Sequence, residues 1–155
     1  MKQALILARR AARHNDVPIG AVIVHNGKII ARGENKVQQK KNPTLHAEIV
    51  AINRACKKLG EKFLTECDIY VSLEPCAMCA TAISFARIRN IYFAATDAKG
   101  GGITANARIF DTDHHLWHPG ITQSTKYSAE SAQLLRDFFA TRRKTLKEEK
   151  NGKQI

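Results

Sequence analysis

The amino-acid sequence predicts an α/β fold in which helices cover both faces of a mixed β-sheet. Segments with helical periodicity alternate with short segments rich in Val, Ile and Tyr, an order typical of layered α/β proteins. The pair Asn26-Gly27 between two apolar segments indicates a two-residue hairpin, so part of the sheet is antiparallel. With 155 residues the chain is the size of one domain with one core, and we expect a single domain over residues 1–155.

The first half of the chain is predicted to hold two helices that flank a hairpin. Leu5, Ala8 and Ala12 form an apolar stripe with arginines off it, which indicates a helix over residues 2–14. Strands are expected at 20–25 and 28–33, a polar loop at 34–43, and a second helix at 44–59 that ends at Gly60.

The second half continues the alternation. Strands are expected at 68–73 and 90–95, separated by a helix over 76–87 with Pro75 at its start. The stretch from the glycines at 100–102 to Tyr127 is rich in loop, and its sequence does not assign it to particular elements. A long helix is expected from Ser128 to about residue 150, with a core-facing stripe of four side chains: Leu134, Leu135, Phe138 and Phe139.

The charge balance is strongly basic. Lys and Arg number 25 against 14 Asp and Glu, a net charge of +11. Such an excess attracts phosphate-bearing partners, although solubility alone is an alternative reason for it. No apolar stretch approaches the roughly 20 residues that span a bilayer, and no signal peptide is evident, so we expect a cytoplasmic protein without a membrane segment.

Two short segments carry the chemistry. His46-Ala47-Glu48 is followed, after 26 intervening residues, by Pro75-Cys76-Ala77-Met78-Cys79. One imidazole and two thiolates are a ligand set for a catalytic zinc with an open fourth position. Together the segments resemble the known H-x-E … P-C-x-x-C signature of zinc deaminases that act on nucleobases. We therefore expect one Zn2+ per subunit, held by His46, Cys76 and Cys79, in a zinc-dependent hydrolase.

The spacing of these residues constrains the geometry. Cys76 and Cys79 lie three positions apart, on one face at a helix N-terminus, where the helix dipole favours thiolates. Two residues of helix would turn Glu48 by about 200° from His46. Both can reach one ion only if it lies beyond the helix end, where Glu48 is predicted to shuttle protons from a zinc-activated water.

Other uses of these cysteines remain open at this point. A closed structural zinc site would take Glu48 or Cys67 as a fourth ligand, and a redox role would use the Cys76–Cys79 pair alone. Cys56 and Cys67 lack such spacing and are expected to be free, buried thiols.

Several blocks of the sequence resemble the bacterial tRNA-specific adenosine deaminase family of the cytidine-deaminase-like superfamily. The zinc motif marks the superfamily, whereas the block at residues 97–99 and the tail with Phe138-Phe139 and Arg142-Arg143 narrow the resemblance to the RNA-acting branch. The resemblance covers nearly the whole chain, at residues 17–22, 42–48, 70–79, 97–99 and 134–139, and at Arg142-Arg143.

The resemblance implies a three-layer α/β/α sandwich with a mixed five-stranded sheet, and a homodimer. It implies hydrolytic deamination of adenosine to inosine at the wobble position of a tRNA anticodon loop. The tRNA anticodon stem-loop would be the partner, and the base of such a loop is cheaply extruded into a pocket.

Residue roles follow from the resemblance by motif position. Glu48 is implied as the acid/base and Asn35 as a contact to the nucleoside, although Asn35 also suits a plain turn. The backbone amides of Ala47 and Cys76 are placed to steady the tetrahedral centre. RNA contacts are expected from Asp97, Lys99, Arg142 and Arg143, with Lys144 beside them; solvated surface charge is the alternative for each of the cations.

The chain departs from the family pattern at a few positions. Glu34 and Leu45 stand where other residue types are usual, and His114, His115, Trp117 and His118 form either an RNA-contact edge or a surface loop. Two further functions stay open: a deaminase of a free base or nucleoside (guanine, cytosine or cytidine), and a zinc-stabilised RNA-binding module without catalysis.

Overall fold

The computed structural model describes residues 1–111 and 116–152 and contains a mixed five-stranded sheet in the order β2-β1-β3-β4-β5. β1 pairs antiparallel with β2 and with β3, whereas β3–β4 and β4–β5 are parallel. The strands are β1 (Gly20–His25), β2 (Lys28–Glu34), β3 (Cys67–Leu73), β4 (Asn90–Ala95) and β5 (Gly120–Gln123).

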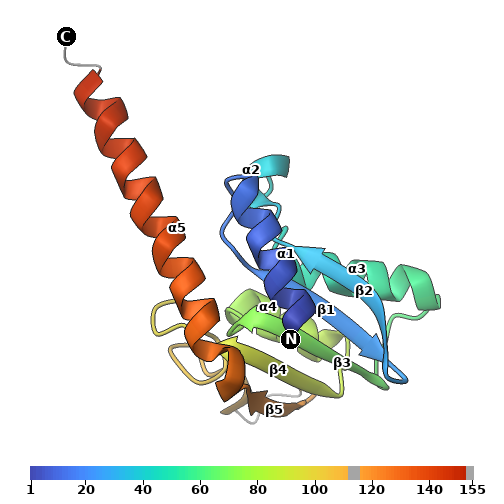
Figure 1. Ribbon diagram of the computed structural model, residues 1–155. Helices are drawn as coiled ribbons and strands as arrows, with labels where there is room; N and C mark the ends of the chain where they lie inside the picture. Colours follow the sequence, from blue (N-terminus) through green and yellow to red (C-terminus); the bar gives the residue numbers. More distant parts are fainter. Residues whose placement is uncertain (112–115, 153–155) are drawn as a thin grey trace.

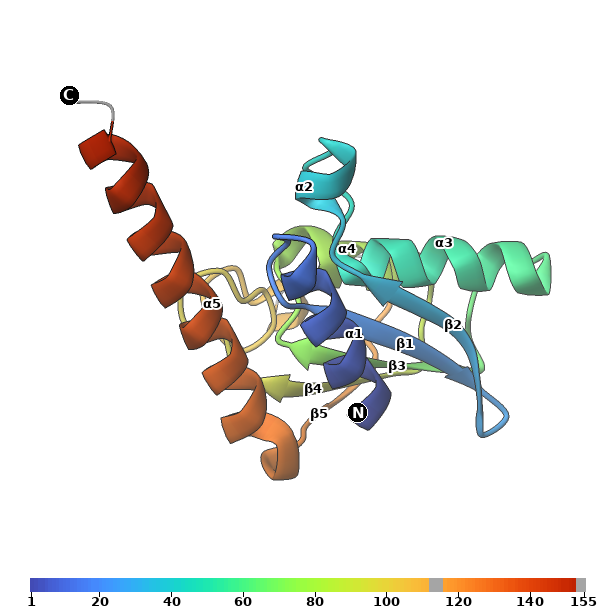
Figure 2. The same ribbon diagram turned by 45° about the horizontal axis from the view of Figure 1, so that its top comes forward.

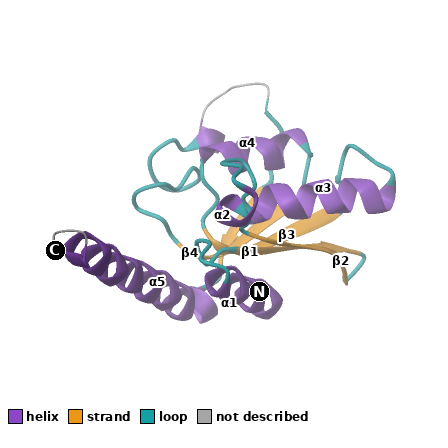
Figure 3. Ribbon diagram, turned by 90° about the horizontal axis from the view of Figure 1, so that it is seen from above, coloured by secondary structure: helices purple, strands orange, loops and turns teal. Residues whose placement is uncertain are grey.

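Helices cover both faces of the sheet, which confirms the three-layer α/β/α architecture (Figure 1; Figure 3). α3 and α4 lie on one face and α1 and α5 on the other. The helices are α1 (Lys2–Arg13), α2 (Val37–Lys40), α3 (Ala47–Leu59), α4 (Ala77–Phe85) and α5 (Thr125–Gly152), with a 3-10 turn at Ile109–Asp111.

The hairpin between β1 and β2 forms as the Asn-Gly pair predicts. Asn26 has φ of 48° and Gly27 has φ of 72°. Positive φ at both central residues is the requirement of a type I′ turn, whose twist matches that of the strands it joins. This turn fixes which residues of the hairpin face each helical layer.

Two glycines allow the helices to pack closely on opposite faces of this hairpin. A Cβ on Gly20 would lie 2.1 Å from the carbonyl oxygen of Ala4 in α1. A Cβ on Gly33 would lie 2.0 Å from the carbonyl oxygen of Ala47 in α3. The second contact sets the position of the α3 N-terminus, where the His46 motif lies.

Two expectations about elements were wrong, and a stretch that the sequence left unassigned contains a strand. The region 34–43 is not all loop, because α2 forms within it. The second helix begins at Ala47 and not at residue 44, because the Asn42 side chain accepts bonds from the Thr44 amide and hydroxyl and holds a turn there. The stretch before Tyr127 contains β5, a short exposed strand with little sequence signal.

The helix of the cysteine motif is also shorter than expected. It spans Ala77–Phe85, so Cys76 is its N-cap and Pro75 lies before the helix. Arg87, predicted as the last helical residue, instead has φ of 53°, a left-handed conformation that ends the segment.

The terminal helix does not present a core stripe. Of the α5 residues whose burial is described, only Ser131 is buried, and its hydroxyl donates to the carbonyl of Ser72 in β3. Leu134, Leu135 and Phe138 are half-buried and Phe139 is exposed. The reason is that the later turns of α5 leave the body of the fold (Figure 1; Figure 2).

Candidate active site

A cavity of about 360 Å3 lies where the N-termini of α3 and α4 meet. Its walls come from three parts of the chain: the segment before β1 with α2, the end of β3 with the loop after β4, and one side of α5. The residues that line this cavity include Asp16, Asn35, Val37, Gln38, His46, Glu48, Glu74, Cys76, Asp97, Gly100 and Phe139.

The three expected metal ligands converge at this cavity. His46 is the N-cap of α3 and Cys76 the N-cap of α4, with Cys79 in the first turn of α4. The Nδ1 atom of His46 lies 3.6 Å from the sulfur of Cys76 and 3.6 Å from that of Cys79. All three ligand atoms fall within 4.8 Å of one another, close enough to bind one ion.

Glu48 lies beside this group in the first turn of α3. It is 3 % exposed, and its Oε2 atom has no hydrogen-bond partner among the residues that the structure describes. Burial raises the pKa of its carboxyl to about 7. A carboxyl with that pKa exchanges protons readily near neutral pH, as an acid/base catalyst must.

The thiols and the imidazole form one hydrogen-bonded unit. The hydrogen bond with Cys79, supported by that with His46, lowers the pKa of Cys76 to about 4. The same contact with Cys76, together with burial, raises the pKa of Cys79. The hydrogen bond with Cys76 also raises the pKa of His46. Cys76 is therefore a thiolate, the form that binds metals.

The donor set fits a soft or borderline cation with one open position. Two sulfurs and one imidazole nitrogen suit zinc better than hard cations. Within residues 1–111 and 116–152, no fourth His, Cys, Asp or Glu joins the group. Cys67 begins β3 whereas Cys76 follows the end of that strand, so a closed site with Cys67 as fourth ligand does not form.

The remaining cysteines are free, as expected. Cys67 is buried and Cys56 is half-buried, and burial raises the pKa of both thiols. No disulfide links any of the four cysteines, all of which lie in the described residues.

The structure also brings Asn35 to the cavity, whereas Ala47 lies between the lining residues His46 and Glu48. Asn35 follows β2, is 3 % exposed, and its Oδ1 atom has no partner among the described residues. A buried amide oxygen without a partner is costly unless a ligand satisfies it. Ala47 is fully buried as the first residue of α3, where backbone N–H groups lack helical partners.

The loop after β4 carries Asp97 and Lys99. Asp97 lines the cavity, and its Oδ1 atom accepts hydrogen bonds from the amides of Lys99 and Gly100, each 3.0 Å long. Lys99 is exposed. These bonds make a tight turn that presents the lysine to solvent at the cavity rim.

Arg142 and Arg143 lie further along α5. Both are exposed and line a second cavity of about 270 Å3 together with Phe139, which also lines the site cavity. Gln38 of α2 belongs to both cavities as well. The two hollows are therefore neighbours, and the arginines line the one beside the site.

Two buried carboxylates of the site were missed at the level of sequence. Asp16 is fully buried and Glu74 is 2 % exposed. Burial alone would raise the pKa of Glu74, but hydrogen bonds donated by the amides of Asp97, Thr104, Ile103 and Ala105 hold it below its ordinary value. Neither residue has a sequence signal, because the partners of each carboxylate are mainly backbone amides far along the chain.

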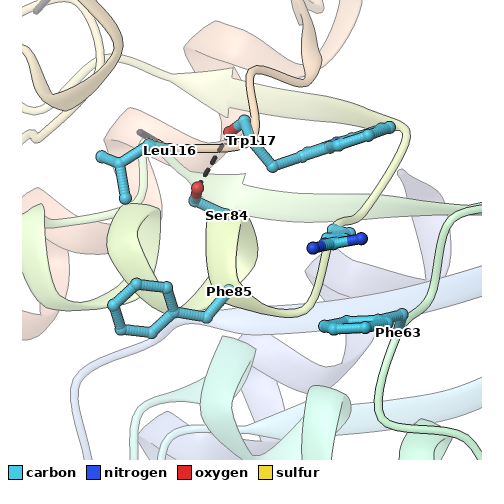
Figure 4. A pocket seen from close by; sticks show the side chains of 6 residues that line it. Phe63, Ser84, Phe85, Leu116 and Trp117 are labelled. Carbon is cyan, nitrogen blue, oxygen red and sulfur yellow. Dashed lines mark hydrogen bonds between the residues drawn. The ribbon is translucent and has the colours of Figure 1, made fainter. Parts of the chain in front are cut away.

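A larger hollow of about 490 Å3 lies elsewhere, at the C-terminal end of α4 (Figure 4). Phe63, Phe85 and Trp117 line it, and the Arg87 guanidinium stacks 4.0 Å from the Phe63 ring. It contains none of the expected site residues. Trp117 and His118 are exposed, whereas His114 and His115 lie outside the described residues.

Comparison with known proteins defines the class. The family model of MafB19-like deaminases matches residues 1–143, so the fold and site are those of a deaminase. A tRNA-specific adenosine deaminase of Agrobacterium fabrum is 46% identical over 147 residues, which cover 92% of this chain and 93% of that protein. The chain therefore belongs to the deaminase family and is related to the bacterial tRNA-specific adenosine deaminases.

Solved structures agree on the fold. One of them comes from work on A-to-I editing by tRNA:A34 deaminases at the wobble position of transfer RNA. It superposes with a TM-score of 0.84 at 44% sequence identity, and the match covers 87% of this chain and 97% of that chain. A guanine deaminase of Bacillus subtilis superposes with a TM-score of 0.60 at 46% identity, over 61% of each chain.

Proposed function

We propose that this protein deaminates adenosine to inosine at the wobble position of a tRNA anticodon loop. The observation that carries the chemistry is the convergence of His46, Cys76 and Cys79 on one cavity with the free Oε2 atom of Glu48. The substrate is inferred from the relatives named above, which act on transfer RNA by their names.

One Zn2+ per subunit is proposed as the cofactor, held by His46 Nδ1 and the sulfurs of Cys76 and Cys79. Bound there, zinc supplies a water whose pKa is brought to near 7. The soft donor set and the absence of a fourth ligand among the described residues support this choice.

Glu48 is the proposed proton shuttle. Its Oε2 atom accepts a proton from the attacking water and delivers it to a ring nitrogen, as oxygen adds to C6 of the adenine. Glu48 then passes the second proton of the water to the amine, the C6–N bond breaks, and ammonia leaves. The products are inosine and ammonia, and water is the only co-substrate.

Asn35 and two backbone amides are proposed to orient the base. The unpartnered Oδ1 atom of Asn35 is placed to accept a hydrogen bond from the bound nucleoside. The amides of Ala47 and Cys76 lie at the two helix N-termini, where oriented N–H groups stabilise negative charge.

The anticodon stem-loop is the proposed partner, with Asp97, Lys99, Arg142 and Arg143 as its contacts. The net charge of +11 favours a phosphate backbone, and the arginines line the hollow beside the site cavity. Asp97 would accept a hydrogen bond from a nucleotide hydroxyl at the rim, a contact that distinguishes RNA from DNA.

We further propose one zinc-dependent deaminase domain over residues 1–155 that works as a homodimer in the cytoplasm. α4 exposes Met78 (36%) and Phe85 (67%), which with Thr81 and Ala82 form an uncharged face. Such a face suits a second copy better than a polyanion.

Free cysteines suit a reducing compartment, and no described helix is long and apolar enough to cross a membrane.

The dimer is tested by the mass of the particle in solution. Phe85→Glu should convert a dimer into a monomer, because it buries a charge in the interface. Ile6→Glu is the matched control, since Ile6 is exposed (46%) on α1. A wild-type monomer, or a dimer unaffected by Phe85→Glu, would contradict this interface.

Guanine deamination is the second candidate. The similarity to the Bacillus subtilis guanine deaminase favours it, and the same Glu48 chemistry would serve it.

The two candidates are separated by incubating the protein with an anticodon stem-loop that has adenosine at the wobble position, and with free guanine, cytosine and cytidine. Inosine in the RNA alone supports the proposal; ammonia from a free base or nucleoside alone supports the alternative. Tight RNA binding without either product would indicate a module without catalysis.

A further inference from the structure

Besides Glu48, two of the side chains that line the site cavity are buried carboxylates without a cationic partner. Asp16 is 0 % and Glu74 is 2 % exposed, and neither takes part in the ion pairs found among residues 1–111 and 116–152. An ionised carboxylate that loses its water is strongly disfavoured unless hydrogen bonds replace it. Both side chains obtain these bonds mainly from the backbone of the cavity walls.

Asp16 binds the first turn of α2. Its Oδ1 atom accepts the amide of Gln38 at 2.7 Å, and its Oδ2 atom accepts the amide of Gln39 at 3.2 Å. The side-chain amide of Gln39 donates to the same Oδ2 atom at 3.2 Å. Asp16 thus caps a helix that lies more than 20 residues away in sequence.

This cap is important because α2 has little other support. α2 spans only Val37–Lys40, none of its residues is buried, and its N-cap Lys36 makes no side-chain cap bond. Isolated helices of this length are not stable. Yet Val37 and Gln38 line the cavity, and α2 begins two residues after Asn35.

Glu74 binds the loop after β4 in the same way. Its Oε2 atom accepts the amide of Asp97 at 3.0 Å. Its Oε1 atom accepts the amides of Ile103 at 3.1 Å, Thr104 at 2.6 Å and Ala105 at 3.3 Å. One carboxylate therefore holds both ends of the segment 97–105.

The same segment packs against the metal-ligand motif. The Gly102 amide donates to the carbonyl of Pro75 at 2.8 Å, and Gly101 pairs with Cys76 in an isolated β-bridge. A Cβ on Gly101 would lie 2.5 Å from the carboxyl carbon of Glu74, so this approach requires glycine. Asp97 and Gly100 of this segment line the cavity.

We propose that Asp16 and Glu74 are positioning residues that each fix one wall of the substrate cavity: Asp16 fixes α2 with Asn35, and Glu74 fixes the segment 97–105 with Asp97. This inference rests on the proposed function for the identity of the substrate. Burial of each carboxylate is tolerated only while its wall supplies the amide donors, so carboxylate and wall are held together. Neither residue touches the reacting atoms.

The test uses Asp16→Asn and Glu74→Gln in the zinc-loaded, full-length protein. Each variant keeps the side-chain volume but replaces one acceptor oxygen by a donor NH2 group, which cannot accept the wall amides. Asp68→Asn is the matched control, because Asp68 is also a hydrogen-bonded carboxylate, with Arg89 and Asn90 as partners, but lies outside the cavity.

Two readouts are expected to change. Backbone amide exchange should accelerate at Gln38 and Gln39 in Asp16→Asn, and at Ile103 and Thr104 in Glu74→Gln, without change at the other wall. KM for the stem-loop should rise about tenfold in each variant, equivalent to about 1.4 kcal/mol, with kcat nearly unchanged and one zinc retained. Asp68→Asn should change neither readout.

Several results would overturn the proposal: unchanged amide exchange in the variants, faster exchange with unchanged KM, or a fall in kcat with loss of zinc. If Asp16→Asn does not fold, Asp16→Glu replaces it in the test. The longer carboxylate should raise amide exchange and KM in the same direction, but by a smaller amount. If the wild-type protein makes no inosine, the proposed function fails, while amide exchange still decides whether the carboxylates hold the walls.

Discussion

His46 and Glu48 are separated by one residue, yet both line the same cavity, because only Glu48 lies within α3. His46 precedes the helix with an extended backbone, at φ −69° and ψ 157°. The helical rotation of about 200° between the two positions therefore does not apply. The imidazole reaches the sulfurs across the end of the helix while the carboxylate of Glu48 stays buried beside them.

Glu48→Gln should abolish turnover and leave zinc bound. The amide keeps the shape of the carboxyl but cannot shuttle a proton, and general acid–base catalysis contributes roughly 10²–10⁴-fold. Single-turnover inosine formation and zinc content are the measurements, with Glu61→Gln, an exposed position, as control. Retained activity, or loss of zinc, would show that Glu48 has a different role.

Cys79→Ser should lose zinc and activity together, because Cys79 offers one of the three ligand atoms of the proposed zinc site. Cys67→Ser is the matched control: both cysteines are buried, at 0 % and 1 % exposure, but Cys67 lies outside the ligand group. Zinc is measured by atomic absorption after dialysis. Equal zinc content in the two variants would contradict the assignment of the ligands.

Lys99→Ala and Arg143→Ala should each reduce the slope of log affinity against log salt by about 1, since each removes one of the proposed phosphate contacts. Affinity for the stem-loop is measured by fluorescence anisotropy over a range of salt concentrations. Lys28→Ala serves as control, because Lys28 is an exposed cation at the hairpin. A slope that Lys99→Ala leaves unchanged would mean that Lys99 meets no phosphate.

The pair Asp68–Arg89 predicts a specific dependence of stability on pH. The hydrogen bonds from Arg89, 2.9 Å long, hold the pKa of Asp68 below its ordinary value of 3.8. A depressed carboxyl pKa stabilises the fold above the unfolded-state pKa, and this contribution is lost as pH falls through the folded-state pKa. Asp68→Asn should therefore lower the urea midpoint at pH 7, and the difference from wild type should disappear towards pH 2. A difference that is constant over this pH range would contradict the ion pair.

The fold was predictable wherever the signal was local. The turn at Asn26-Gly27 depends on two residues that tolerate positive φ, and the structure has both. α2 was not predictable, because its cap comes from Asp16, which lies more than 20 residues earlier. The exposure of Phe139 was missed as well, because an apolar stripe on a helix does not show whether a partner layer is present.

The residues of the candidate site likewise divide into those that the sequence predicts and those that it does not. His46, Cys76 and Cys79 were predictable as a group because metal ligation requires fixed residue types at short spacing. Glu74 was not, since its partners are backbone amides, which any sequence supplies. Spacing in sequence reveals side-chain pairs, whereas contacts to the backbone appear only when the chain is folded.

The most direct test of the central claim is the product formed from full-length tRNA with adenosine at the wobble position. After nuclease digestion, mass spectrometry of the nucleosides and their flanking fragments locates any inosine, and ammonia release from free guanine is assayed in parallel. We expect inosine at the wobble position alone, in the wild type but not in Glu48→Gln, and no ammonia from guanine. Ammonia from guanine with an unmodified tRNA would contradict it.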